Sequence, residues 1–110
     1  MQRLTRRADF LAARQGPRAP ESAFLVQARD RRDTAAPRVG FTVSKKAGTA
    51  VERNRIRRRL RQAAKNVMSA AGKSGFDYVL IARREALALP FAALVEDLER
   101  ALKKIHGKAG

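Results

Sequence analysis

The sequence has no cysteine and few acidic residues: ten Asp and Glu stand against 25 Lys and Arg. The absence of cysteine excludes a disulfide framework, a zinc site with cysteine ligands and thiol catalysis. No apolar run approaches the ~18 residues that a membrane-spanning helix needs, so we expect no membrane partner. The basic N-terminus is followed by no apolar stretch of signal-peptide length, and we expect a cytoplasmic protein.

Positive charge is what the sequence has in excess. The formal net charge is +15 over 110 residues, and such a charge repels itself unless a counter-charge is near. The sequence therefore indicates a polyanion as partner. The length predicts one domain over residues 1–110, in which the 45% of hydrophobic residues suffice for a core but we expect no deep active site.

Three segments have the periodicity of helices. The first covers residues 6–15, with Thr5 as its N-cap and a Gly-Pro pair after it. The second runs from Val51 or Glu52 to Ala71 and gathers its apolar residues within an arc of about 100°. The third opens at Pro90. Its apolar stripe comprises Phe91, Leu94, Val95, Leu98, Leu102 and Ile105.

Three other segments have strand patterns. Residues 23–29 and 38–44 alternate with a period of two, as half-buried strands do, and we expect residues 30–37 to form a hairpin loop between them. Residues 16–21, rich in Gly and Pro, are expected to be a connector. A continuous apolar run at 76–83 predicts a buried central strand. The order α-β-β-α-β-α predicts an α+β sandwich, with a sheet of three or four strands and helices packed on it.

The second helix carries an unusual density of arginine. Its segment RNRIRRRLRQAAK, from Arg53 to Lys65, has seven basic residues in thirteen. An ordinary solvated helix face mixes acids with bases, so this pattern favours a phosphate-binding surface. The spacing places Arg53, Arg57, Arg61 and Lys65 on one ridge, and the planar guanidinium matches phosphate oxygens bidentately.

RNA is a better fit than DNA for this basic helix. It lies between strands, with no short helix before it to complete a helix-turn-helix. In the first helix, Phe10 lies between Arg6 and Arg14 at a spacing of four, an arrangement suited to stacking on unpaired bases. Core packing explains Phe10 equally well.

The acidic residues do not form a nuclease site. A two-metal phosphodiesterase needs several converging carboxylates, and the ten acids are scattered along the chain. His106 is the only histidine, and we expect it to be a solvated residue at a helix end. The chain therefore predicts binding to a partner that supplies the chemistry.

The string from Arg38 to Lys65 resembles the protein subunit of bacterial ribonuclease P. The resemblance rests on Val-Ser-Lys-Lys at residues 43–46 followed by Arg-Asn-Arg at 53–55, and it extends to Asp9-Phe10 and to Asp77-Tyr78-Val79. It implies a ribonucleoprotein whose RNA is the catalyst, with Mg²⁺ bound mainly by that RNA, and which removes the 5′ leader of precursor tRNA. It also implies a left-handed crossover between parallel strands around the basic helix.

The resemblance implies two sets of site residues. The partners are the ribonuclease P RNA and the single-stranded leader of precursor tRNA. The RNA-binding residues would be Lys45, Lys46, Arg53, Asn54, Arg55, Arg57, Arg58, Arg61 and Lys65. The leader cleft would comprise Phe10, Arg14, Leu25 and Gln27.

The chain departs from the family pattern at two of these positions. The family often has aromatic residues where this sequence has Arg14 and Gln27. We therefore expect a cleft that holds the leader more by charge and hydrogen bonding than by stacking. Two other functions remain open from the residues alone: a ribosomal or general structured-RNA-binding protein, and an autonomous nuclease.

Overall fold

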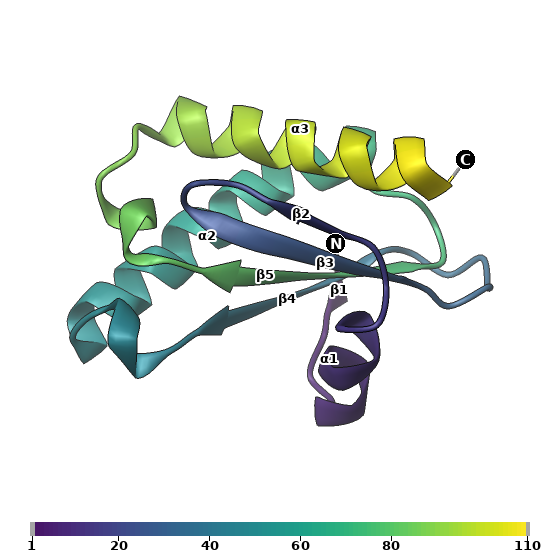
Figure 1. Ribbon diagram of the computed structural model, residues 1–110, viewed down its shortest axis with the longest axis horizontal. Coiled ribbons are helices and arrows are strands. Elements are labelled where there is room, and N and C mark those ends of the chain that lie inside the picture. The colour runs from purple at the N-terminus through teal and green to yellow at the C-terminus, as the bar shows by residue number, and fades with distance from the viewer. Residues whose placement is uncertain (1, 110) are drawn as a thin grey trace.

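A computed structural model describes residues 2–109 as a five-stranded sheet with helices on both faces (Figure 1). The helices are α1 (Arg7–Ala13), α2 (Ala50–Ala71) and α3 (Phe91–Ala109), with short 3-10 turns η1 (Lys45–Ala47) and η2 (Arg84–Leu87). The strands are β1 (Gln2–Arg3), β2 (Arg18–Pro20), β3 (Phe24–Asp30), β4 (Arg38–Val43) and β5 (Phe76–Ala82). The predicted α+β class is confirmed.

The sheet has the strand order β1-β4-β5-β3-β2, with β5 parallel to β4 and antiparallel to β3. The predicted hairpin of the strands at 23–29 and 38–44 is therefore wrong, because β5 lies between them. Alternation identifies a half-buried strand but not its partner, whereas the continuous apolar run of β5 needs burial on both faces and takes the centre. The unit β4-α2-β5 is a parallel crossover, for which the family resemblance predicts the left hand.

The sequence predicts three or four strands, whereas the sheet has five, and the two edge strands are the unpredicted ones. β1 pairs with β4, and β2 lies inside the expected connector and pairs with β3. Segments of two or three residues are too short to show a period, and Pro20 is tolerated because β2 has only one neighbour.

The sheet separates two layers of apolar side chains. Helices α2 and α3 cover one face, where Phe24, Ile56, Leu60 and Leu98 are fully buried (Figure 1). Helix α1 covers part of the other face over a smaller cluster of Leu4, Ala13 and Val79, with Phe10 and Ile81 packed against it. Among residues 2–109, no helix is both long enough and apolar enough to span a membrane.

The helix starts differ from the predicted ones. Helix α1 begins at Arg7, and its N-cap residue is Arg6 without a side-chain bond, so the prediction of Thr5 as cap is wrong. Helix α2 begins at Ala50, where the Thr49 hydroxyl accepts from the Glu52 amide at 3.2 Å and the Glu52 carboxylate accepts from the Thr49 amide at 2.9 Å. This capping box fixes the start of the arginine-rich helix.

Two residues of α3 lie in surroundings that the sequence did not predict. Phe91 belongs to the predicted apolar stripe but is 36% exposed, while Leu94, Leu98 and Leu102 of that stripe are buried. His106 is not solvated: its Nε2 lies 2.6 Å from the Tyr78 hydroxyl, and its ring meets that of Phe76 edge-on at 4.8 Å between centroids. Both differences come from the packing of α3 on its neighbours, which helical periodicity does not describe.

Candidate nucleic-acid interface

The arginine side chains of α2 occupy the part of the helix that the core leaves free. Ile56, Leu60 and Val67 face the sheet and are buried, as the apolar arc predicted. Arg55 and Arg58 are exposed, and Arg57 is half-buried. Within residues 2–109, none of these three guanidinium groups has an ion pair with an acid. They are free to bind an external anion.

Glu52, the acidic residue within α2, has its charge compensated inside the protein. Arg84 pairs with its carboxylate at 2.8 Å. The hydrogen bond from Arg84, together with the one from the Thr49 amide, lowers the pKa of Glu52 to about 2. The carboxylate therefore stays ionised and paired, and it contributes little repulsion to an anion at the neighbouring arginines.

A cavity of about 440 Å³ lies where α1 meets the edge of β4 and the first turns of α2. We call it the α1 cavity. Its lining combines three arginines with aromatic and aliphatic side chains. The lining residues are Thr5, Arg7, Phe10, Leu11, Arg14, Phe41, Thr42, Val43 and Arg57.

The sheet and α1 approach closely beside this cavity because residue 40 is glycine. A Cβ atom there would lie 2.6 Å from two ring atoms of Phe10. The Phe10 ring therefore lies over the Gly40 backbone, half-buried, with an edge on the cavity. The packing and ligand-binding interpretations of Phe10 are thus compatible.

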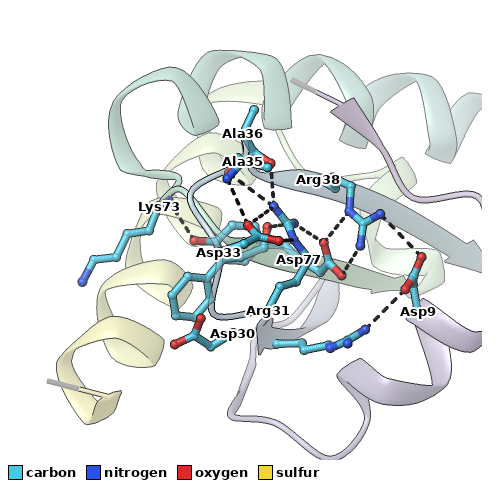
Figure 2. A network of polar contacts seen from close by, with 12 residues as sticks. Asp9, Asp30, Arg31, Asp33, Ala35, Ala36, Arg38, Lys73 and Asp77 are labelled. Carbon is cyan, nitrogen blue, oxygen red and sulfur yellow. Dashed lines mark hydrogen bonds and ion pairs between the residues drawn. The ribbon is translucent and has the colours of Figure 1, made fainter.

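An ion network holds α1 against the sheet (Figure 2). Asp77 is fully buried in β5 and accepts from Arg31 at 2.5 Å and from Arg38 twice at 2.8 Å. Arg38 also pairs with Asp9 of α1 at 3.6 Å, and Arg29 donates to Asp9 at 3.3 Å. The sheet therefore fixes α1, and with it one wall of the cavity, through charged bonds.

A second hollow, which we call the α2 groove, lies along the exposed side of α2. It is lined by Val51, Asn54, Arg57, Arg58 and Arg61. Arg57 donates to the Asn54 side-chain oxygen at 3.2 Å, which orients its guanidinium. Because Arg57 lines both this groove and the α1 cavity, the two predicted binding regions meet at one side chain.

The remaining predicted site residues are more dispersed. Gln27 is only 5% exposed, and neither it nor Leu25 lines the α1 cavity, although Leu25 lies on the same strip of sheet through its pairing with Ile81. Lys45 is exposed in η1. The structure therefore brings Phe10 and Arg14 together with Arg57 and leaves Gln27 beneath the surface.

Four more of the predicted basic residues either line other hollows or are half-buried. Lys46 lines a separate hollow with Arg83 and Arg84, and Lys65 lines one near the end of α2. Arg53 and Arg61 are half-buried, each with an Nε atom that has no hydrogen-bond partner among the described residues.

Several lining residues were not predicted from the sequence. Arg7 and Leu11 lie one turn apart with Arg14 on the same side of α1, and this spacing could have identified them. No sequence pattern identifies Phe41 and Thr42 as cavity residues, because they line the cavity only through the placement of α1 over β4.

The described residues offer no cluster suited to a metal ion: among residues 2–109 no three His, Cys, Asp or Glu side chains converge. Asp77 and Asp9 are already engaged with arginines. The arrangement is suited to binding anions, with guanidinium groups over a partly aromatic floor.

Comparison with known proteins gives one consistent family. The model of the family described as Ribonuclease P matches residues 1–106. The chain is 48% identical over 106 residues to the ribonuclease P protein component of Ruegeria pomeroyi, covering 94% of this chain and 85% of that one. It is 48% identical over 103 residues to that of Gluconacetobacter diazotrophicus, covering 93% and 89%.

Solved structures give the same result. The RNase P protein of Thermotoga maritima superposes with a TM-score of 0.78 at 28% identity, covering 96% of this chain and 98% of that one. The RNase P protein of Staphylococcus aureus gives 0.77 at 30% identity, covering 94% of each. A Staphylococcus aureus mutant described as defective in mRNA degradation activity gives 0.77 at 31%, covering 93% and 86%.

Proposed function

Because this chain belongs to the ribonuclease P protein family, we propose that it is the protein component of a cytoplasmic ribonuclease P that removes 5′ leaders from precursor tRNA. In this proposal the α2 groove binds the ribonuclease P RNA. The α1 cavity binds the single-stranded leader. The RNA performs the cleavage, and Mg²⁺ is bound mainly by the RNA.

The position of Arg57 carries the proposal. Arg57 lines both the α1 cavity and the α2 groove, and its guanidinium donates to the Asn54 side-chain oxygen at 3.2 Å. A protein that joins a catalytic RNA to its substrate needs adjacent surfaces for two polyanions. Arg57 and Arg58 can screen the repulsion between the phosphates on either side.

The α1 cavity suits a single strand better than a duplex. Its lining combines the apolar rings of Phe10 and Phe41 with the guanidinium groups of Arg7 and Arg14. Unpaired bases contact such apolar surfaces while their phosphates meet guanidinium groups, without any requirement for a fixed sequence. The buried Gln27 leaves charge as the main source of leader affinity in place of the hydrogen bond that the sequence suggested.

The test is a reconstitution of precursor-tRNA cleavage. The chain alone, the ribonuclease P RNA alone at low Mg²⁺ and the two together are incubated with a precursor tRNA. The proposal predicts cleavage at the 5′ end of the tRNA only in the combination. Cleavage of the precursor tRNA by the chain alone would instead support an autonomous nuclease.

A matched pair of variants links the assay to the surface. Arg57→Gln should lower cleavage at subsaturating protein, because both hollows lose a phosphate contact. Lys103→Gln removes the same charge from an exposed position in the C-terminal half of α3 and should act as wild type. Equal losses for the two variants would show that only net charge matters, and would reject the assigned site.

A further inference from the structure

A further hollow lies beside the α2 groove, where α2 meets the first turn of α3. It has a volume of about 410 Å³ and is lined by Arg55, Arg58, Arg59, Gln62 and Phe91. We call it the Phe91 hollow. Arg58 also lines the α2 groove, so the hollow continues the basic surface rather than standing apart from it.

Phe91 differs from the other phenylalanines of the chain. Phe24 is fully buried, Phe10, Phe41 and Phe76 are half-buried, and Phe91 is exposed at 36%. A single exposed apolar side chain is common on protein surfaces. This ring, however, faces a hollow whose other walls are three guanidinium groups and an amide.

Arg59 builds the hollow. Its guanidinium donates to the Leu87 carbonyl at 2.9 Å and also to the Leu89 carbonyl. These bonds attach the segment between η2 and α3 to α2. Phe91, two residues beyond Leu89, is thereby held beside the exposed arginines instead of moving with a free loop.

Two of the three guanidinium groups of the hollow, those of Arg55 and Arg58, are available to a ligand. Within the described part of the chain, Arg55 and Arg58 have no acidic partner, and both are exposed. The Gln62 side chain is exposed as well and offers both a donor and an acceptor. Cations at the wall, an aromatic ring and one amide match the phosphates, the flat face and the polar edge of a nucleotide.

We propose that the Phe91 hollow binds one unpaired nucleotide of the ribonuclease P RNA, separate from the leader in the α1 cavity. The base stacks on Phe91, and the flanking phosphates meet Arg55 and Arg58. The proposal rests on the proposed function, since it takes that RNA as the partner. An acidic protein is a poorer match, because a planar base uses the exposed ring face in a way that carboxylates do not.

Binding of the ribonuclease P RNA by Phe91 variants tests the proposal. Phe91→Ala should weaken binding by about 5- to 150-fold, the range for removing an aromatic ring beneath one base. Phe91→Leu keeps an apolar side chain and the fold but should bind nearly as weakly. Phe91→Tyr, which restores an aromatic face, should recover wild-type affinity. Wild-type affinity for both Ala and Leu variants would overturn the proposal.

Fluorescence provides a second readout, because the chain contains no tryptophan. In Phe91→Trp the single indole should be quenched by unstructured single-stranded RNA and much less by duplex RNA. The control Glu99→Trp places an indole at an exposed position two turns further along α3, and it should not respond. Equal quenching of both, or none at position 91, contradicts base stacking at this site.

The two proposals fail in distinguishable ways. If wild-type protein does not bind the ribonuclease P RNA at all, the proposed function is wrong. If wild type binds, Arg57→Gln weakens binding and the Phe91 variants do not, then the proposed function stands and the Phe91 hollow is not a nucleotide site.

Discussion

Asp77 shows how a single buried charge organises this protein. It is fully buried, yet it meets two guanidinium groups and so leaves neither its charge nor its oxygen atoms unpaired (Figure 2). Removing this carboxylate would leave the guanidinium groups of Arg31 and Arg38, whose side chains are 8% and 27% exposed, without a shared partner, and unpairing charges away from water is costly. In the sequence, Asp77 is only an acidic residue near the start of the apolar run at 76–83, and no pattern identifies Arg31 and Arg38 as its partners.

We expect Asp77→Asn to lower the free energy of unfolding by about 3–5 kcal/mol, the usual cost of unpairing a buried ion. Asp33→Asn is the control, because Asp33 also accepts from Arg31 but is exposed, and it should cost at most ~1 kcal/mol. Urea denaturation at pH 7 measures both. Similar losses for the two variants would mean that burial of Asp77 has no energetic consequence.

Variants of Arg14 and Phe10 distinguish the contribution of charge from that of base stacking in the α1 cavity. Arg14 is exposed and lines the cavity, whereas Phe10 also lines it but is half-buried because its ring packs over Gly40. We therefore expect Arg14→Ala to weaken binding of the precursor-tRNA leader more than Phe10→Ala does, in holoenzyme whose fold is verified by circular dichroism. The reverse order would show that the leader is held mainly by the aromatic ring.

Among the elements, α3 is attached to β5 through His106. Burial lowers the pKa of His106 below its usual range, and the positive charge of Lys73 acts in the same direction. The folded protein therefore keeps this ring neutral, with Tyr78 beside it. An unfolded histidine protonates near pH 6.5, so the unfolded state binds more protons as the pH falls below that value.

The contribution of His106 to stability should accordingly be complete above about pH 7.5 and should decline as the pH falls through 6.5 to about 5.5. The pKa of Glu52 is lowered from 4.5 to about 2, so its contribution to stability is lost only as the pH falls below about 4.5. It therefore does not affect stability between about pH 7.5 and 5.5. Thermal melts should show a lower midpoint at pH 5.5 for wild type and a smaller difference for His106→Gln. An unchanged difference in the variant would exclude His106 as the cause.

The elements also show how far the sequence predicts the structure. The apolar arc of α2, its end at Gly72 and the burial of β5 followed from residue periodicity, because one face of each must meet the core. Strand pairing did not follow, since the partner of β3 is set by the competition for the sheet centre. The short strands β1 and β2 and the N-cap Arg6 left no pattern to detect.

At the scale of the whole molecule, the sequence predicted that the protein has a basic surface on α2 better than it predicted which residues from other elements lie beside that surface. The run of arginines identified α2 as the basic face, and the resemblance identified the family. Only the fold brings Arg57 from α2 to Phe10 and Arg14 of α1 and places Gln27 beneath the surface. Contacts between distant segments depend on topology, which local spacing does not record.

The salt dependence of RNA binding tests the central claim, that the arginines of α2 dock this chain on the ribonuclease P RNA. If about six phosphates are neutralised, a plot of log K against log salt concentration should have a slope of roughly −4 to −5. The double variant Arg57→Gln/Arg58→Gln should reduce that slope by about 1.4–1.8, at ~0.7–0.9 for each phosphate contact.

The control is Lys103→Gln/Lys104→Gln, which removes two exposed charges from α3, one of them 3.8 Å from Glu21, and neither residue lines the α1 cavity, the α2 groove or the Phe91 hollow. The account predicts a lower slope and weaker binding for the α2 variant and wild-type behaviour for the α3 variant. A slope that is unchanged in the α2 variant, or lowered equally in both, would contradict it.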